Sequence, residues 1–130
     1  MLVEGTLGEI RMQLVRLYSG KDGQSHFEDI DIVLEPVHIA HFSKAVAVEN
    51  LKFGKIGDMN EITWHTQDEP AYIVILNGAM ELEVGDGTKK VINAGDILLA
   101  EDTTGQGHIT RSIKGKGWSF LIAPVKKVNN

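Results

Sequence analysis

Two histidines of the chain lie beside apolar runs, in positions where they could meet and do chemistry. His65 precedes the apolar run 71–76, and His108 opens the run 108–113 after a glycine turn. An imidazole titrates near neutral pH, so it can move a proton or form hydrogen bonds. It is also a ligand for borderline metal ions. If both side chains reach one cavity, the sequence predicts a site there.

Two readings of that site follow from the residues around His65. Because side chains alternate along a strand, residues 65, 67 and 69 of an extended strand project to one face. Glu69 would then supply a carboxylate ligand and Gln67 a weak neutral one, although Pro70 disfavours regular strand geometry there. The predicted metal set is His65, Gln67, Glu69 and His108. Without a metal, His65, Gln67 and His108 become ligand-binding residues, and both histidines are candidate catalytic groups.

Several other polar residues have two possible roles. Glu101 and Asp102 could orient an imidazole ring or hold a cation, or they could begin a solvated turn with Thr103 and Thr104. His26 could cap one end of a barrel or simply lie in a turn.

Three more features have simpler explanations. His38 and His41 could share a helical face, but no third ligand is near them in sequence, so surface or packing roles are expected. Arg111 faces away from His108 by alternation and is expected to pair with an outer carboxylate. Trp64 and Trp118 are expected in the core or at a subunit interface.

The elements that must position these residues are short strands separated by turn residues. Alternating or continuous apolar runs predict strands at 11–18, 27–34, 45–56, 71–76, 79–84, 91–92, 97–100, 108–113 and 118–123. Residues 36–44 have no clean period, so a loop or a turn of helix is expected there. No helical stretch is long enough for a βαβ unit. The pattern therefore predicts a β-sandwich or barrel.

Composition excludes several classes of protein. The chain has 130 residues, which is typical of one domain, and it has no cysteine, so disulfides and thiolate chemistry are excluded. The net charge of −5 disfavours nucleic-acid binding. No apolar stretch approaches the roughly 20 residues that cross a bilayer, and no basic segment followed by an apolar run opens the chain. A cytoplasmic location without membrane association is expected.

From Glu61 to Ala123 the chain resembles the cupins, a family of small jelly-roll barrels. Gly78 matches the closing glycine of the family's first motif, and His65 matches its first histidine. Gly95 matches the first glycine of the second motif. His108 lies two positions after the place where that motif has its histidine. Other motif positions differ: Met59, Gln67 and Ala71 depart from the first motif, and Glu101, Thr103 and Ser112 from the second. The framework matches, and the metal ligands match only in part.

The resemblance implies one antiparallel jelly-roll domain over 1–130, with N-terminal strands and loop in 1–44 and the barrel in 45–124. It also implies a homodimer, in which the N-terminal segment adds strands to the sheet or crosses to the partner. We expect a protein that binds a small molecule in the barrel without a tight metal site, and we expect no cofactor. One alternative is a metal-dependent isomerase, oxygenase or lyase that uses Zn, Mn, Fe or Ni on a small organic acid, sugar or aromatic. The other is a non-catalytic scaffold.

Overall fold

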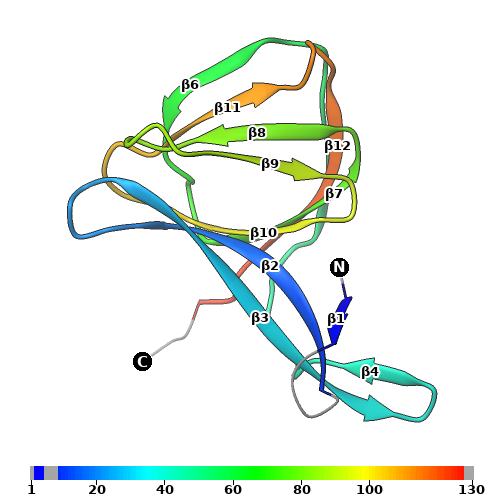
Figure 1. The fold of residues 1–130 in the computed structure, drawn as a ribbon. Coiled ribbons are helices and arrows are strands. Elements are labelled where there is room, and N and C mark those ends of the chain that lie inside the picture. The colour runs from blue at the N-terminus through cyan, green and yellow to red at the C-terminus, as the bar shows by residue number, and fades with distance from the viewer. Residues whose placement is uncertain (1, 5–8, 128–130) are drawn as a thin grey trace.

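The computed structural model describes residues 2–4 and 9–127, and these residues form strands and no helix (Figure 1). The strands are β1 (Leu2–Glu4), β2 (Ile10–Ser19), β3 (Ser25–Val37), β4 (Ala40–Phe42), β5 (Lys52–Ile56), β6 (Glu61–His65), β7 (Ala71–Asn77), β8 (Ala79–Glu83), β9 (Lys89–Asn93), β10 (Ile97–Glu101), β11 (His108–Ser112) and β12 (Trp118–Pro124). The predicted all-β class is confirmed.

From β5 onward the chain crosses repeatedly between two sheets, and only the hairpin β8–β9 stays within one of them, which gives the strand order of a jelly roll. The large sheet contains the series β10-β7-β12-β5, and the small sheet has the order β6-β11-β8-β9. This is the arrangement of two Greek keys, so the predicted cupin-like jelly roll is confirmed. Backbone pairing among the described residues does not join the two sheets into one closed barrel.

The N-terminal strands extend the large sheet. β2 lies beside β10 and pairs with it in parallel, which is the exception in an otherwise antiparallel structure. β3 pairs with β2 along its length, and this ribbon runs out beyond the two sheets to β4 and β1 (Figure 1). The expectation that this segment adds strands to the sheet is therefore confirmed. Residues 36–44, predicted as a loop or helical turn, contain the β3–β4 hairpin, whose turn includes His38 at φ 54°.

The core lies between the two sheets. Alternation along β8 turns Met80 and Leu82 inward, while Glu81 and Glu83 face outward. Leu17 of β2 also lies in this core, because β2 continues the large sheet next to β10. The buried cluster is completed by Ile75, Val84, Ile92, Leu98, Ala100 and Trp118.

The predicted long strand at 45–56 is wrong in its first half. Only β5, Lys52–Ile56, is a strand, and before it Val48 forms a single bridge to Val125. Asn50 has a positive φ of 50°, which breaks the extended path. Apolar alternation alone did not reveal this interruption.

No helix long and apolar enough to cross a bilayer is present among the described residues.

Candidate functional site

His65 and His108 meet between the two sheets. They are directly opposed on β6 and β11, where the pairing register shifts just after His108. The centroids of the two rings lie 4.3 Å apart with an angle of 56° between the ring planes. Two imidazoles that lie 43 positions apart in the sequence (65 and 108) therefore belong to one local site.

The imidazole ring of His108 is hydrogen-bonded through Nδ1 to a buried carboxylate. Its Nδ1 lies 2.6 Å from Oδ2 of Asp102, and both side chains are buried. The hydroxyl of Ser25 donates to the same carboxylate oxygen at 2.8 Å. Oδ1 of Asp102 is buried and has no hydrogen-bond partner among the described residues. Because a carboxylate accepts hydrogen bonds, it holds a proton on Nδ1 of His108 and leaves Nε2 for other partners.

His65 is oriented in the same way by the backbone. Its Nδ1 lies 2.8 Å from the carbonyl oxygen of Thr63. A carbonyl oxygen can only accept a hydrogen bond, so Nδ1 of His65 carries the proton and Nε2 remains available. The backbone of Gly107 packs close to the His65 carbonyl at a φ of 79°, where any Cβ atom would collide with that carbonyl. Glycine at 107 is therefore required for His108 and His65 to approach.

Both histidines line a cavity of about 240 Å³ between the sheets. Most of its wall is apolar: Ile56, Ile73, Leu98 and Phe120 come from the large sheet, and Met80 and Leu82 from the small one. Gln67 and Thr110 add polar groups to the wall. The site is thus an apolar chamber with a polar end built around two imidazoles.

Gln67 and Glu69 have different positions from those expected of a continuous strand. β6 ends at His65, so the assumed alternation through residues 65, 67 and 69 is wrong. Gln67 reaches the cavity from an irregular segment, where its backbone N–H donates to the Asp102 carbonyl. Glu69 lies exposed in a bend and is not part of the cavity wall. Pro70 follows directly and is consistent with this interruption.

The residues that meet in the cavity do not fit a tight metal site. Such a site takes three or four protein ligands, with histidine, cysteine or carboxylate donors. Here the potential metal donors at the cavity are the two imidazoles and the side-chain amide of Gln67. The Asp102 carboxylate is not one of them, because it is hydrogen-bonded to Nδ1 of His108. No group of three or more histidines or carboxylates arranged to hold a metal ion occurs in the described part of the chain.

Two roles left open by the sequence can now be distinguished. Asp102 orients the His108 ring, while its neighbour Glu101 turns away and pairs with Arg16 at 2.6 Å. That carboxylate raises the pKa of Arg16 above its ordinary value.

Ser25 had no sequence signal for its role, because only the fold brings it to Asp102. His26 lies near the loop between β2 and β3, where its Nε2 contacts the Asp22 carboxylate.

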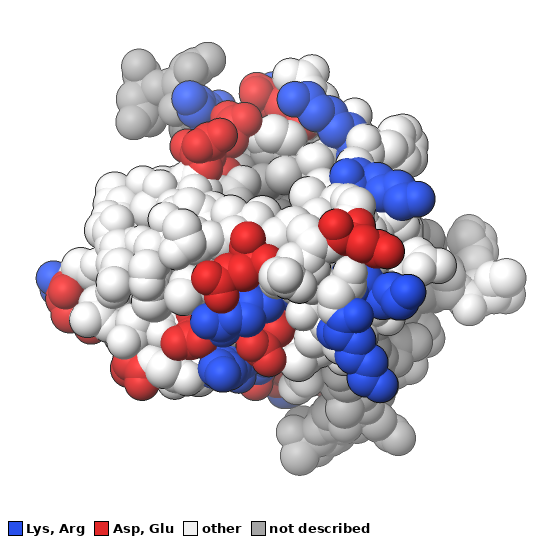
Figure 2. Space-filling view, turned by 90° about the horizontal axis from the view of Figure 1, so that it is seen from above, with Lys and Arg blue, Asp and Glu red and all other residues white. Residues whose placement is uncertain are grey.

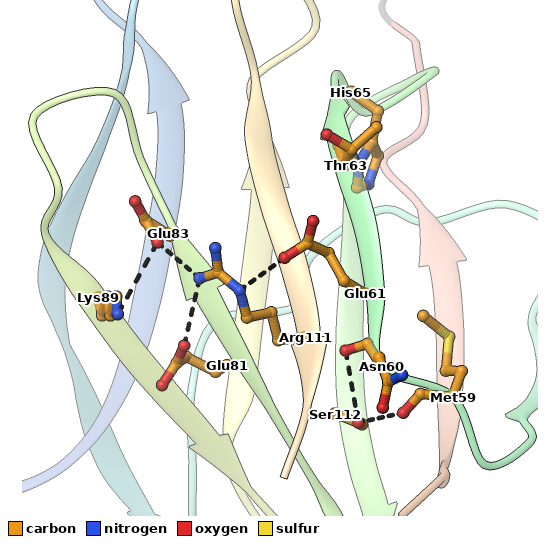
Figure 3. A network of polar contacts seen from close by, with 10 residues as sticks. All are labelled: Met59, Asn60, Glu61, Thr63, His65, Glu81, Glu83, Lys89, Arg111 and Ser112. Carbon is orange, nitrogen blue, oxygen red and sulfur yellow. Dashed lines mark hydrogen bonds and ion pairs between the residues drawn. The ribbon is translucent and has the colours of Figure 1, made fainter. Parts of the chain in front are cut away.

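The remaining polar and aromatic residues lie outside the cavity, with one exception. Arg111 binds the outer carboxylates Glu61, Glu81 and Glu83, as predicted (Figure 3). His38 and His41 are both exposed. Trp64 is 38% exposed on β6, whereas Trp118 is buried and lines the cavity.

Comparison with known proteins gives likeness of fold alone. No family model matches the chain, and no curated protein sequence matches it. Solved structures similar to it include a conserved protein of unknown function from Streptococcus pyogenes, with 16% identity over 68% of this chain and 72% of that one, at a TM-score of 0.47.

Two further similar structures are described as cupins. A cupin domain from Bordetella pertussis shares 17% identity over 64% of this chain and 91% of that one, at a TM-score of 0.46. A cupin 2 conserved barrel domain protein from Rhodopseudomonas palustris shares 14% identity over 99% of this chain and 83% of that one, also at 0.46. At such identities the likeness does not extend to a ligand or an activity.

Proposed function

We propose that the protein binds a small, mainly apolar molecule carrying one hydroxyl or carboxyl group in the cavity between its two sheets. The observation that carries this proposal is the shared orientation of His65 and His108. The Nδ1–H group of each ring donates a hydrogen bond to an acceptor of the protein, so Nε2 of each ring is available to a ligand. A neutral imidazole in this state accepts a hydrogen bond at Nε2, so a ligand O–H is a matching partner.

The rest of the cavity limits the size and character of the ligand. Its volume of about 240 Å³ lies below the roughly 300–1,000 Å³ of pockets that hold drug-sized molecules. A single aromatic ring or a short branched chain suits this space. The surrounding Ile, Leu, Met, Trp and Phe side chains favour an apolar body through removal of its surface from water. Gln67 offers one further hydrogen-bonding group.

A second candidate function is proton transfer on such a molecule. The observation that favours it is Asp102, a buried carboxylate whose Oδ2 contacts the ring that faces the cavity. If His108 accepts a proton at Nε2, the ring becomes a cation, and the adjacent carboxylate stabilises it. The same arrangement also suits a ligand bound as an anion, with the proton retained on the imidazole.

Ligand-induced thermal stabilisation tests the binding proposal. The panel should contain single-ring and branched aliphatic compounds in matched sets: carboxylic acid, alcohol, and the hydrocarbon of equal size. We expect acids or alcohols to raise Tm and the hydrocarbons to raise it less. The His65→Ala, His108→Ala double variant should lose the difference, while His41→Ala, which changes an exposed histidine, should keep it.

The outcome against the proposal is equally clear. If no compound raises Tm, or if the double variant responds like the parent protein, the two imidazoles do not form a binding site. Elemental analysis of the purified protein should accompany the assay. Stoichiometric metal that disappears in the double variant would favour the metal-dependent alternative over the function proposed here.

A further inference from the structure

Every arginine of the chain is already paired with carboxylates outside the cavity. On the outer face of the small sheet, acidic and basic side chains gather together in a view onto this side of the molecule (Figure 2). The ion pairs join Arg111 to Glu61, Glu81 and Glu83, Arg16 to Glu28 and Glu101, and Arg11 to Glu9 and Asp31. A cation that meets a ligand in the cavity therefore has to be a lysine or a protonated histidine.

The cavity opens on the side where β5 and β6 lie. These are edge strands of the large and the small sheet, and no backbone pairing joins them in the described residues. The cavity residues that they supply, Ile56 and His65, are half-buried, whereas Leu98 of β10 is buried. Ile62 of β6 pairs with Thr110 of the cavity wall and is nevertheless 38% exposed. Solvent therefore reaches the cavity between these two edges.

Lys52 lies on the inner face of the large sheet at this opening. Residues that pair directly share a face, and Lys52 of β5 pairs with Ile122 of β12, which pairs in turn with Ile73 of β7. Both isoleucines line the cavity. Gly54 of β5 faces the same way, because a Cβ there would meet the ring of Phe120, another residue of the cavity wall. The exposed side chain of Lys52 therefore starts at the rim of the cavity.

This part of the rim belongs to the end of the cavity that contains the histidines. The row of paired residues that begins with Lys52 ends at Leu98 of β10. Ala100, the next inward-facing residue of β10, also lines the cavity, and Asp102 follows just beyond the strand and binds His108. A lysine side chain is long and flexible, so from this position its ammonium group can extend toward the two imidazoles.

A second inward-facing lysine has a different environment, because it closes the opposite side of the molecule. Lys90 of the edge strand β9 pairs with Leu82 of the cavity wall, and its Nζ lies 2.7 Å from Oδ1 of Asp29 on β3. This ion pair joins the small sheet to the N-terminal ribbon. Lys52 has no carboxylate within ion-pair distance in the part of the chain that the structure describes. Its charge is therefore available to a ligand.

We propose that Lys52 determines the specificity of the cavity, so that the ligand is a small apolar carboxylic acid bound as its anion. This inference rests on the function proposed above and specifies the class of its ligand. The apolar body of the acid lies among the aliphatic and aromatic side chains of the wall, and its carboxylate lies between the imidazoles and the ammonium group of Lys52.

The balance of charge explains why Lys52 favours an acid over an alcohol. A carboxylate only accepts hydrogen bonds, so it meets Nε2 of His108 when that ring carries a second proton, taken from the ligand's own carboxyl group or from water. The site then holds two carboxylates, those of Asp102 and the ligand, and two cations, the imidazolium and Lys52. Without Lys52, one negative charge in an apolar chamber would lack a partner, which is unfavourable. An alcohol brings no charge and needs no such partner.

Calorimetric titration with two matched pairs of compounds tests the proposal. The pairs are benzoate with benzyl alcohol and isovalerate with isoamyl alcohol. We expect the parent protein to bind the acid of each pair more tightly than the alcohol. Lys52→Met keeps a long apolar side chain and should weaken acid binding about fivefold, a modest factor because water screens a charge at the rim, and should leave alcohol binding unchanged. Added salt should weaken acid binding to the parent more than to Lys52→Met.

Two further variants make the result specific to the charge at this position. Lys55→Met is the matched control, because Lys55 lies on the same strand but pairs with Ser119 on the outer face, and it should bind both compounds like the parent. Lys52→Arg keeps the positive charge and should retain the preference for the acid.

The failures of this inference and of the proposed function are distinguishable. Tighter binding of the alcohol by the parent, equal losses for acid and alcohol in Lys52→Met, or a loss of acid binding as large in Lys55→Met would overturn the role of Lys52, while binding of the alcohol would still support a ligand in the cavity. If neither compound of either pair binds to the parent protein, the proposed function fails and this inference fails with it.

Discussion

The carboxylate of Asp102 lies 2.6 Å from Nδ1 of His108, and the two side chains form a buried pair. Asp102 lies just beyond the end of β10, and His108 begins β11, so the intervening loop brings them together. Ser25 donates a second hydrogen bond to the same carboxylate oxygen from the start of β3. One acidic residue therefore connects the N-terminal ribbon, the loop after β10 and the cavity histidine.

Removal of this carboxylate should destabilise the protein strongly. In Asp102→Ala, the Nδ1 proton of His108 and the hydroxyl of Ser25 both lose their buried acceptor. We expect the free energy of unfolding to fall by about 3 kcal/mol. The control is Glu101→Ala, whose partly exposed pair with Arg16 should contribute less than about 1 kcal/mol. Urea denaturation measures both, and equal losses would contradict a buried role for Asp102.

Gly107 should be essential for the approach of the two histidine strands. In Gly107→Ala, the new Cβ would collide with the backbone of His65 and Thr66 at a φ of 79°. Gly87→Ala has a similar φ of 88° but open space around its Cβ, so it measures the backbone penalty alone, about 1 kcal/mol. Chemical denaturation should show a clearly larger loss for Gly107→Ala. Equal losses would mean that the close contact at His65 can relax.

A substitution at Gly54 should reduce the volume of the cavity. A Cβ at residue 54 would meet the ring of Phe120, which lines the cavity. The cavity is free space next to this ring, so we expect the ring to be displaced into it, and Gly54→Ala should narrow the chamber. We expect the dissociation constant of a bound ligand to increase about tenfold. The change in the free energy of unfolding should be smaller than this change in binding free energy. Gly57→Ala, which has open space, should change neither. Calorimetric titration is the measurement, and unchanged affinity in Gly54→Ala would place the ligand elsewhere.

A pH effect is expected at the loop between β2 and β3. Hydrogen bonds from His26 and from the Gln24 backbone lower the pKa of Asp22 below its ordinary value. A lowered folded-state pKa stabilises the protein above the unfolded-state value of about 4, and this contribution disappears as the pH falls through the folded-state value.

The comparison of Asp22→Asn with the parent protein tests this expectation. The difference in unfolding free energy should be present at neutral pH and vanish in acid. Asp68→Asn, at an exposed bend, is the control and should show little difference at any pH. If the Asp22→Asn difference grew on acidification, the assigned contacts of Asp22 would be wrong.

Most of the fold could be predicted because strand signals in this chain are local. Alternation in 79–84 and the turn at Gly85 to Gly87 place β8 without any knowledge of the rest. The failure at 45–56 is also physical. Its apolar residues alternate like those of a strand, yet several of them are exposed, and Asn50 bends the chain into a positive φ.

The candidate site was less predictable, because its parts depend on tertiary contacts. His65 and His108 could be named from the sequence as a possible pair, and the role of Asp102 could be given as one of two options. Ser25 could not be found, since nothing local links it to a carboxylate 77 residues away. Glu69 was misplaced because the strand was assumed to continue past His65.

Nitrogen NMR of histidine-labelled protein tests the central claim most directly. The chain has five histidines, and single His→Gln variants assign their signals. We predict that neutral His65 and His108 both carry the proton on Nδ1, and that a bound acid or alcohol shifts their Nε2 signals while His38 and His41 stay unchanged. A proton on Nε2 of either cavity histidine in the neutral protein, or a ligand that leaves both Nε2 signals unmoved, would contradict it.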